Sequence, residues 1–174
     1  DFIFKMSPEQ IDRLESSDAV SVLQASTSQH GVVRLRTDAG SLGEDVRVRQ
    51  ALKYATNRDE LNEVLWQGRA TVGNNDPIAP VFSAFFDDAI ENQTYDPEMA
   101  CQLLTEAGMN PLEATLNAPN ALGYPDVAAL LQQQWSATGC INVDIQVQEE
   151  GLYYDLSNPD NYFDVELGIT GWGD

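Results

Sequence analysis

Basic residues are scarce in this sequence. It has nine Lys and Arg against 28 Asp and Glu, a single histidine, and a formal net charge of −19. Proteins bind the phosphates of nucleic acids and anionic lipids through Lys and Arg, so this composition argues against both as partners. Long hydrophobic runs are also missing, since no stretch approaches the roughly 20 apolar residues that a membrane-spanning helix needs.

Motifs for catalysis and metal binding are absent as well. The sequence has no Gly-x-Ser-x-Gly elbow, no His-Glu-x-x-His or Cys-x-x-Cys pair and no glycine-rich phosphate loop. The acidic pairs Asp87-Asp88 and Glu149-Glu150 lack the register of a calcium loop. We therefore predict no catalytic residue, no metal site and no cofactor. Two alternatives remain open: a hydrolase that uses His30 as its base, and a free-standing interaction domain.

What is present favours one α/β domain with a mixed sheet flanked by helices. A chain of 174 residues with 43% hydrophobic residues can bury a sizeable core. Alternation of apolar residues and turn chemistry predict strands, and helical spacing with caps predicts helices. The predicted strands are 2–4, 19–23, 31–35, 112–116, 141–147 and 162–170, and the predicted helices are 8–16, 45–68 (two in tandem), 96–108, 126–138 and 151–156.

The tandem helices between Asp45 and Gly68 are the clearest part of the pattern. Val48, Ala51, Leu52 and Ala55 recur at helical spacing and predict an apolar face that docks on a sheet. Asn57 can cap the second helix, and Glu60 stands where a capping box requires it. Gly68 is placed to end that helix.

A long segment without clear periodicity, residues 69–94, follows these helices. Structureless loops of this length are uncommon and often functional. We expect its aromatic residues, Phe82, Phe85 and Phe86, to pack against the domain rather than contact a ligand. The alternative is that one or two helical turns form between Ser83 and Ile90.

The motifs in the chain resemble those of a known family. The run VRVRQALKYATNRDELNEVLWQG, the later YDPEMACQLLTEAGM and the final GITGWGD are similar, in this order, to segments of the extracytoplasmic solute-binding proteins that serve peptide and nickel ABC importers. Together they span the chain from residue 46 to residue 174. The resemblance implies a two-lobe protein of which residues 1–174 would be one α/β lobe, and both ends look like cuts through a longer chain.

The resemblance also implies a function. Proteins of this family bind peptides or other small solutes between two lobes and deliver them to a membrane permease, so the expected partners are a solute, the permease and the missing lobe. The expected location is periplasmic or at the cell surface. The expected chemistry is binding and not catalysis.

Two groups of residues are candidates for ligand contact. Gly171-Trp172 follows an apolar strand, and in the family it resembles, such a Gly-Trp segment lines the cleft. An acidic residue shortly after it can hold a peptide's amino terminus, a role for which Asp174 is the candidate. The second group is Gln29 and His30, in the polar loop before the predicted strand at Gly31.

The two cysteines, Cys101 and Cys140, form an even pair. In an exported protein such a pair favours a disulfide, whereas in the cytosol it favours two free thiols. Cys101 lies in the first turns of a predicted helix, and Cys140 immediately precedes a predicted strand. We expect a Cys101–Cys140 disulfide if the protein is exported.

Overall fold

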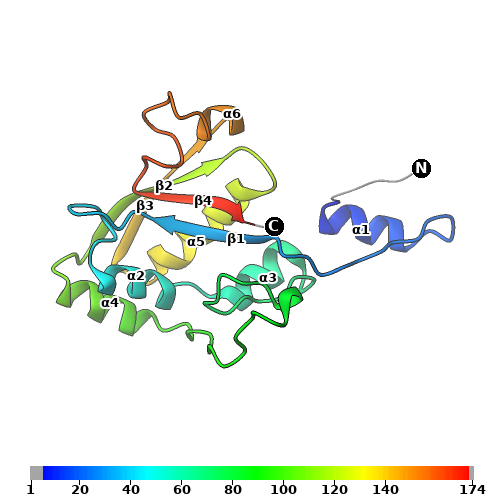
Figure 1. The fold of residues 1–174 in the computed structure, drawn as a ribbon, viewed down its shortest axis with the longest axis horizontal. Coiled ribbons are helices and arrows are strands. Elements are labelled where there is room, and N and C mark those ends of the chain that lie inside the picture. The colour runs from blue at the N-terminus through cyan, green and yellow to red at the C-terminus, as the bar shows by residue number, and fades with distance from the viewer. Residues whose placement is uncertain (1–5, 173–174) are drawn as a thin grey trace.

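The computed structural model describes residues 6–172, and its centre is a four-stranded mixed sheet (Figure 1). The strand order is β1-β4-β2-β3. β2 runs parallel to both β3 and β4, whereas β1 runs antiparallel to β4. The mixed α/β class predicted from the sequence is therefore confirmed. The strands are β1 (His30–Leu35), β2 (Leu112–Pro119), β3 (Ile141–Gln148) and β4 (Leu167–Trp172).

Helices cover the two faces of the sheet unequally. α2, α4 and α5 share one apolar core with the strands on one face. The short α6 packs on the other face. Leu167 and Ile169 of β4 point into the helix-covered core, so Gly168 between them faces the opposite side, and the Tyr153 hydroxyl of α6 lies against it. The helices are α1 (Pro8–Glu15), α2 (Val46–Tyr54), α3 (Arg58–Trp66), the single turn η1 (Pro80–Phe82), α4 (Pro97–Glu106), α5 (Tyr124–Ala137) and α6 (Glu150–Tyr153).

The predicted tandem helices are confirmed as α2 and α3. The apolar residues of α2 are buried, with Val48 and Ala51 fully inaccessible, so this helix docks on the domain as its spacing predicts. Asn57 caps α3 by accepting a hydrogen bond from the backbone N–H of Glu60 at 3.1 Å. Asp96 caps α4 in the same way through Met99, at 2.9 Å. These local contacts supply partners for N–H groups that the helix leaves free.

A disulfide joins Cys101 on α4 to Cys140, the residue before β3. Their Cα atoms lie 5.6 Å apart. The turn between α5 and β3 surrounds the bridge: the Thr138 carbonyl oxygen lies 3.4 Å from the Cys101 sulfur, and the Thr138 hydroxyl lies 3.3 Å from the Cys140 sulfur. The bridge thus ties α4 to the turn that starts the edge strand.

Two predicted strands differ from the structure. Residues 19–23 form no strand, and two of their apolar side chains are exposed, 43% for Val20 and 88% for Leu23. An apolar run becomes a strand only where a neighbouring strand pairs with it, and none of those described lies beside this one. The predicted strand at 2–4 falls outside the described residues.

The last predicted strand begins later than expected. Residues 162–166 form turns, and β4 starts at Leu167 and continues through Gly171 and Trp172. Arg34 explains the turns, because its guanidinium donates to the carbonyl oxygens of Tyr162 and Val165. Those carbonyls are thereby used by a side chain and not by a neighbouring strand. His30, expected in a loop, is instead the first residue of β1.

The segment 69–94 is a loop held together largely by its own hydrogen bonds. The Asn74 amide donates to the carbonyl oxygens of Asp87 and Ile90, and the Asp76 carboxylate accepts from two backbone N–H groups. The predicted packing of its aromatic residues is wrong for Phe85, which is 75% exposed.

Candidate functional site

The sheet brings the two predicted ligand-contact groups together. In the antiparallel pairing of β1 with β4, His30 lies opposite Trp172 and Gly31 opposite Gly171. β2 and β3 run parallel to β4, so they finish at the same end of the sheet. We call this end the carboxyl edge and define it by His30, Pro119, Gln148 and Trp172. In open α/β sheets, ligands bind at the carboxyl ends of the strands.

The residues at the carboxyl edge differ in exposure. Trp172 is 60% exposed, Gly171 and Gln29 are exposed, and His30 is half-buried. A tryptophan offers a large rigid apolar surface, and leaving it uncovered forgoes the free energy of its burial. Trp172 is therefore available for contact with another surface. The fifth predicted residue, Asp174, lies outside the described residues.

Two tyrosines that sequence reasoning missed flank the end of β4. Tyr124 is the first residue of α5, and its hydroxyl lies so close to Gly171 that any side chain at that position would overlap it. Tyr154 follows α6, and its hydroxyl lies 2.8 Å from the Thr170 hydroxyl. Burial raises the pKa of Tyr124, and the nearby Tyr154 and Glu150 raise it further. A Tyr-Pro pair after a glycine is a helix start in sequence, and nothing in that pattern reveals its neighbour on β4.

A buried tyrosine holds α6 against the sheet beside the carboxyl edge. Tyr153 is fully buried, and its hydroxyl lies 2.9 Å from the Ile169 carbonyl oxygen and 3.2 Å from that of Asn117. Burial raises its pKa far above the ordinary value, so the hydroxyl stays protonated as a donor. The contact pins α6 to β2 and β4. Tyr154 is positioned beside Thr170 as a result.

One ring nitrogen of His30 contacts the backbone. Its Nδ1 lies 2.9 Å from the Ser28 carbonyl oxygen. A carbonyl oxygen only accepts, so this contact places the proton on Nδ1. A catalytic base is instead expected within hydrogen-bond reach of a nucleophile. The hydrolase hypothesis therefore receives no support from this geometry.

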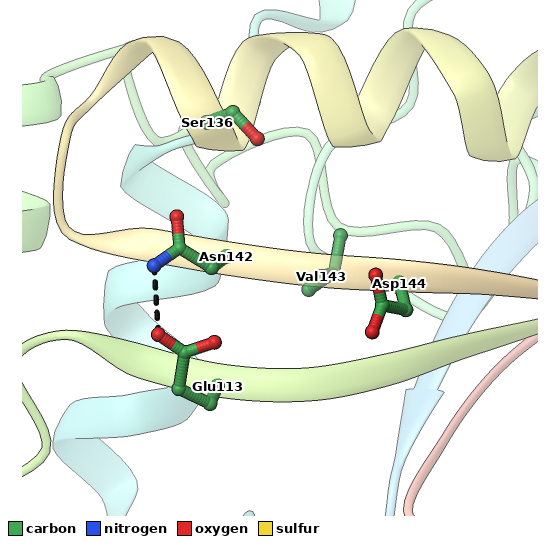
Figure 2. Close-up of a pocket in the computed structure, with 5 residues that line it drawn as sticks. All are labelled: Glu113, Ser136, Asn142, Val143 and Asp144. Carbon is green, nitrogen blue, oxygen red and sulfur yellow. Dashed lines mark hydrogen bonds between the residues drawn. The ribbon is translucent and has the colours of Figure 1, made fainter.

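Two hollows in the surface lie away from the carboxyl edge. One of about 220 Å³ is lined by Ser136 of α5 and by residues near the starts of β2 and β3, where Asn142 donates a 2.7 Å hydrogen bond to Glu113 (Figure 2). A second, of about 370 Å³, lies over the polar face of β2 and β3 and includes Thr115 and Gln146. Neither contains a predicted ligand residue.

Residues 6–172 contain neither a metal-binding cluster nor a membrane-spanning helix. In that range no three His, Cys, Asp or Glu side chains are grouped so that they could hold a metal ion. Every helix there is too short or too polar to span a bilayer.

Comparison with known proteins decides the family. The model described as "Bacterial extracellular solute-binding proteins, family 5 Middle" matches residues 1–174. The chain belongs to this family.

Relatives within family 5 are considerably longer. The dipeptide-binding protein of Escherichia coli is 30% identical over 175 residues, which are 95% of this chain and 31% of the relative. Heme-binding protein A of Haemophilus influenzae is 31% identical over 179 residues, 99% of this chain and 31% of the relative. The chain therefore spans about a third of the length of the curated relatives it matches.

Solved structures share the fold of this family 5 chain. DppA from Helicobacter pylori, in complex with the peptide STSA, matches with a TM-score of 0.79 and 24% identity, over 97% of this chain and 31% of its own. Lactococcal OppA, closed on an endogenous peptide, matches with a TM-score of 0.79 and 18% identity, over 97% of this chain and 36% of its own.

Proposed function

We propose that residues 1–174 form one lobe of a solute-binding protein that serves an ABC importer. The solute would be a peptide or a related small molecule held against the carboxyl edge. Membership of family 5, whose description is of extracellular solute-binding proteins, supports this function. Two relatives, the dipeptide-binding protein of Escherichia coli and di/tripeptide-binding protein 2 of Pseudomonas aeruginosa, support the class of solute through the ligands in their names.

The observation that carries the proposal is the pairing of exposed Trp172 with His30 at the carboxyl edge. An indole on a rigid strand gives an apolar contact surface at little conformational cost. Polar groups beside it, such as Gln29 and the Gly171 backbone, can orient a peptide by hydrogen bonds. This chemistry retains a ligand without changing it. The protein is accordingly proposed as a binding protein and not an enzyme.

The proposal includes three partners and a location. The second lobe would close over the carboxyl edge and remove the ligand from water, because one wall alone leaves most of a ligand solvated. The closed form would dock on a membrane permease. The protein would act outside the cytoplasm, where the Cys101–Cys140 disulfide is stable.

Replacing Trp172 in the full-length protein tests the proposal. Trp172→Ala should weaken peptide binding by roughly 1–3 kcal/mol, as the loss of an aromatic contact does at interfaces. The melting temperature without ligand should change little, because the side chain is 60% exposed. Calorimetry with a di- and tripeptide library measures the first effect and thermal unfolding the second.

Trp66→Ala is the matched control, because Trp66 is also partly exposed but ends α3. It should leave affinity unchanged. Unchanged affinity in Trp172→Ala, together with a large loss of stability, would show that Trp172 is structural and would contradict the proposal.

A further inference from the structure

The pairing between β2 and β4 stops before either strand ends. Their parallel register contains only two residue pairs, Leu116 with Leu167 and Asn117 with Gly168. Beyond these pairs both strands continue to the carboxyl edge. From Ile169 onward, β4 is therefore paired with β1 on one side and, among the described strands, with none on the other.

Pro119 explains why the pairing stops. In this register residue 119 of β2 stands beside Thr170, and its N–H is the group that would reach the Ile169 carbonyl oxygen in the next rung of the ladder. Proline has no N–H, so that hydrogen bond cannot form. Ile169 is only 1% exposed, and its carbonyl oxygen therefore needs a donor from another part of the molecule.

The Tyr153 hydroxyl is that donor. It lies 2.9 Å from the Ile169 carbonyl oxygen and 3.2 Å from that of Asn117, and because a hydroxyl has a single proton, the shorter contact takes it. Gly168 leaves the necessary room, since a Cβ atom at that position would lie 2.6 Å from the hydroxyl oxygen. One side chain of α6 thus stands in for the missing rung of the sheet.

This substitute rung lies just before Trp172 in the sequence. The residue between Ile169 and Gly171 is held as well, because the Thr170 hydroxyl lies 2.8 Å from that of Tyr154. The end of β4 is thus fixed by the β1 ladder on one side and by tyrosine hydroxyls on the other. A contact surface that is already fixed binds more tightly, because no ordering has to be paid when the ligand arrives.

We propose that Tyr153 is a positioning residue for solute binding, whose hydroxyl replaces the rung that Pro119 removes and so holds the end of β4, with Trp172, in the orientation that meets the solute. This inference rests on the proposed function, because it takes Trp172 as part of the wall that contacts the solute. Tyr153 itself makes no contact with the solute, since its side chain is fully buried.

Tyr153→Phe in the full-length protein tests the inference, because it removes the hydroxyl and keeps the ring. Calorimetry with di- and tripeptides should show affinity weakened by about three- to tenfold, the range expected for one neutral hydrogen bond. Amide hydrogen exchange of the ligand-free protein gives a second measurement. Segment 169–172 should exchange faster than in the wild type, while β3 should exchange at the same rate.

Thr56→Val is the matched control. The Thr56 hydroxyl also makes hydrogen bonds within the domain, to the Leu52 carbonyl oxygen at 2.7 Å and to the Trp135 indole N–H at 3.0 Å. Trp135 is near the end of α5, the helix that begins beside Gly171, so the control removes a hydroxyl far from the carboxyl edge. It should lower the melting temperature about as much as Tyr153→Phe and leave affinity and exchange at 169–172 unchanged.

The outcomes separate the inference from the proposed function. Unchanged affinity in Tyr153→Phe overturns the inference, whatever its exchange, while the proposed function stands. An equal loss of affinity in Thr56→Val also overturns it, because affinity would then follow overall stability. If the wild type binds no di- or tripeptide, the proposed function fails and the inference fails with it.

Discussion

Two regions of the molecule, divided at Arg69, are held together by different interactions. In the first region acids are paired with arginines: Arg36 with Asp38 at 2.6 Å, Arg47 with Asp45 at 2.5 Å, and Arg69 with Asp12 at 2.8 Å. The second region has no Lys, Arg or His, so no two of its residues can form an ion pair. Its Glu166 reaches back to Arg36 at 3.9 Å.

The second region is stabilised by neutral contacts instead. Most of the buried core belongs to it, including Leu116, Trp135, Ile141 and Leu167. The disulfide also lies wholly within it. Surface ion pairs contribute little to stability, so a region can do without them if it buries enough apolar area. Its acidic side chains have no Lys, Arg or His of their own region to pair with.

The largest loss of stability should follow from removing the buried Trp135 side chain of the second region. Trp135 is 1% exposed, and its indole N–H donates a 3.0 Å hydrogen bond to the Thr56 hydroxyl, which links the two regions. Trp135→Ala should lower the free energy of unfolding by about 3–5 kcal/mol, because it leaves a large cavity. Denaturant unfolding measures the change. An effect no larger than that of Trp172→Ala would show that the core does not depend on this contact.

Breaking the disulfide should lower the free energy of unfolding by nearly as much. The bridge closes a loop between residues 39 apart in sequence, for which the chain-entropy model gives about 4 kcal/mol. The double variant Cys101→Ala, Cys140→Ala should lose stability of that order in denaturant unfolding.

Thiol titration of the wild type is the companion measurement. Protein folded under oxidising conditions, then denatured without reductant, should show no free thiol. Two titratable thiols would contradict the bridge, and a double variant as stable as the wild type would contradict its role in holding α4 to the sheet.

The smallest change in stability should follow from removing one of the paired acids of the first region. Contacts with Arg47, its side chain foremost, lower the pKa of Asp45 from 3.8 to about 2. A carboxylate whose pKa is lower in the folded than in the unfolded state stabilises the fold at any pH above its unfolded-state pKa. That stabilisation is lost as the pH falls through the folded-state pKa. The stability advantage of wild type over Asp45→Asn should therefore be present at pH 7 and disappear between about pH 4 and pH 2. Asn retains the capping oxygen, so the comparison isolates the charge.

Asp144→Asn provides the contrast from the second region. Asp144 forms no ion pair among residues 6–172. Its removal should change the melting temperature at pH 7 little or raise it slightly, because it relieves repulsion in a chain of charge −19. A loss of stability as large as that of Asp45→Asn would remove the distinction between the two regions.

Features that depend on residues close together in the sequence could be predicted. The caps at Asn57 and Asp96 depend on residues three positions apart, and the apolar stripe of α2 on spacing within one helix, so both are visible in sequence. The alternation of β3 predicted a strand, and the motifs predicted the family. The same logic was wrong at 19–23, where an apolar run has no strand to pair with.

The sequence by itself therefore determined which helices form, how α3 and α4 are capped and to which family the chain belongs, because those properties depend on neighbouring residues. Only the tertiary structure decided that His30 and Trp172 lie opposite each other, that α6 packs on the face away from α5, and that Tyr124 and Tyr154 flank the end of β4. These contacts join residues distant in sequence through strand pairing. Strand register depends on the whole sheet and on burial of one face, and no single segment carries that information.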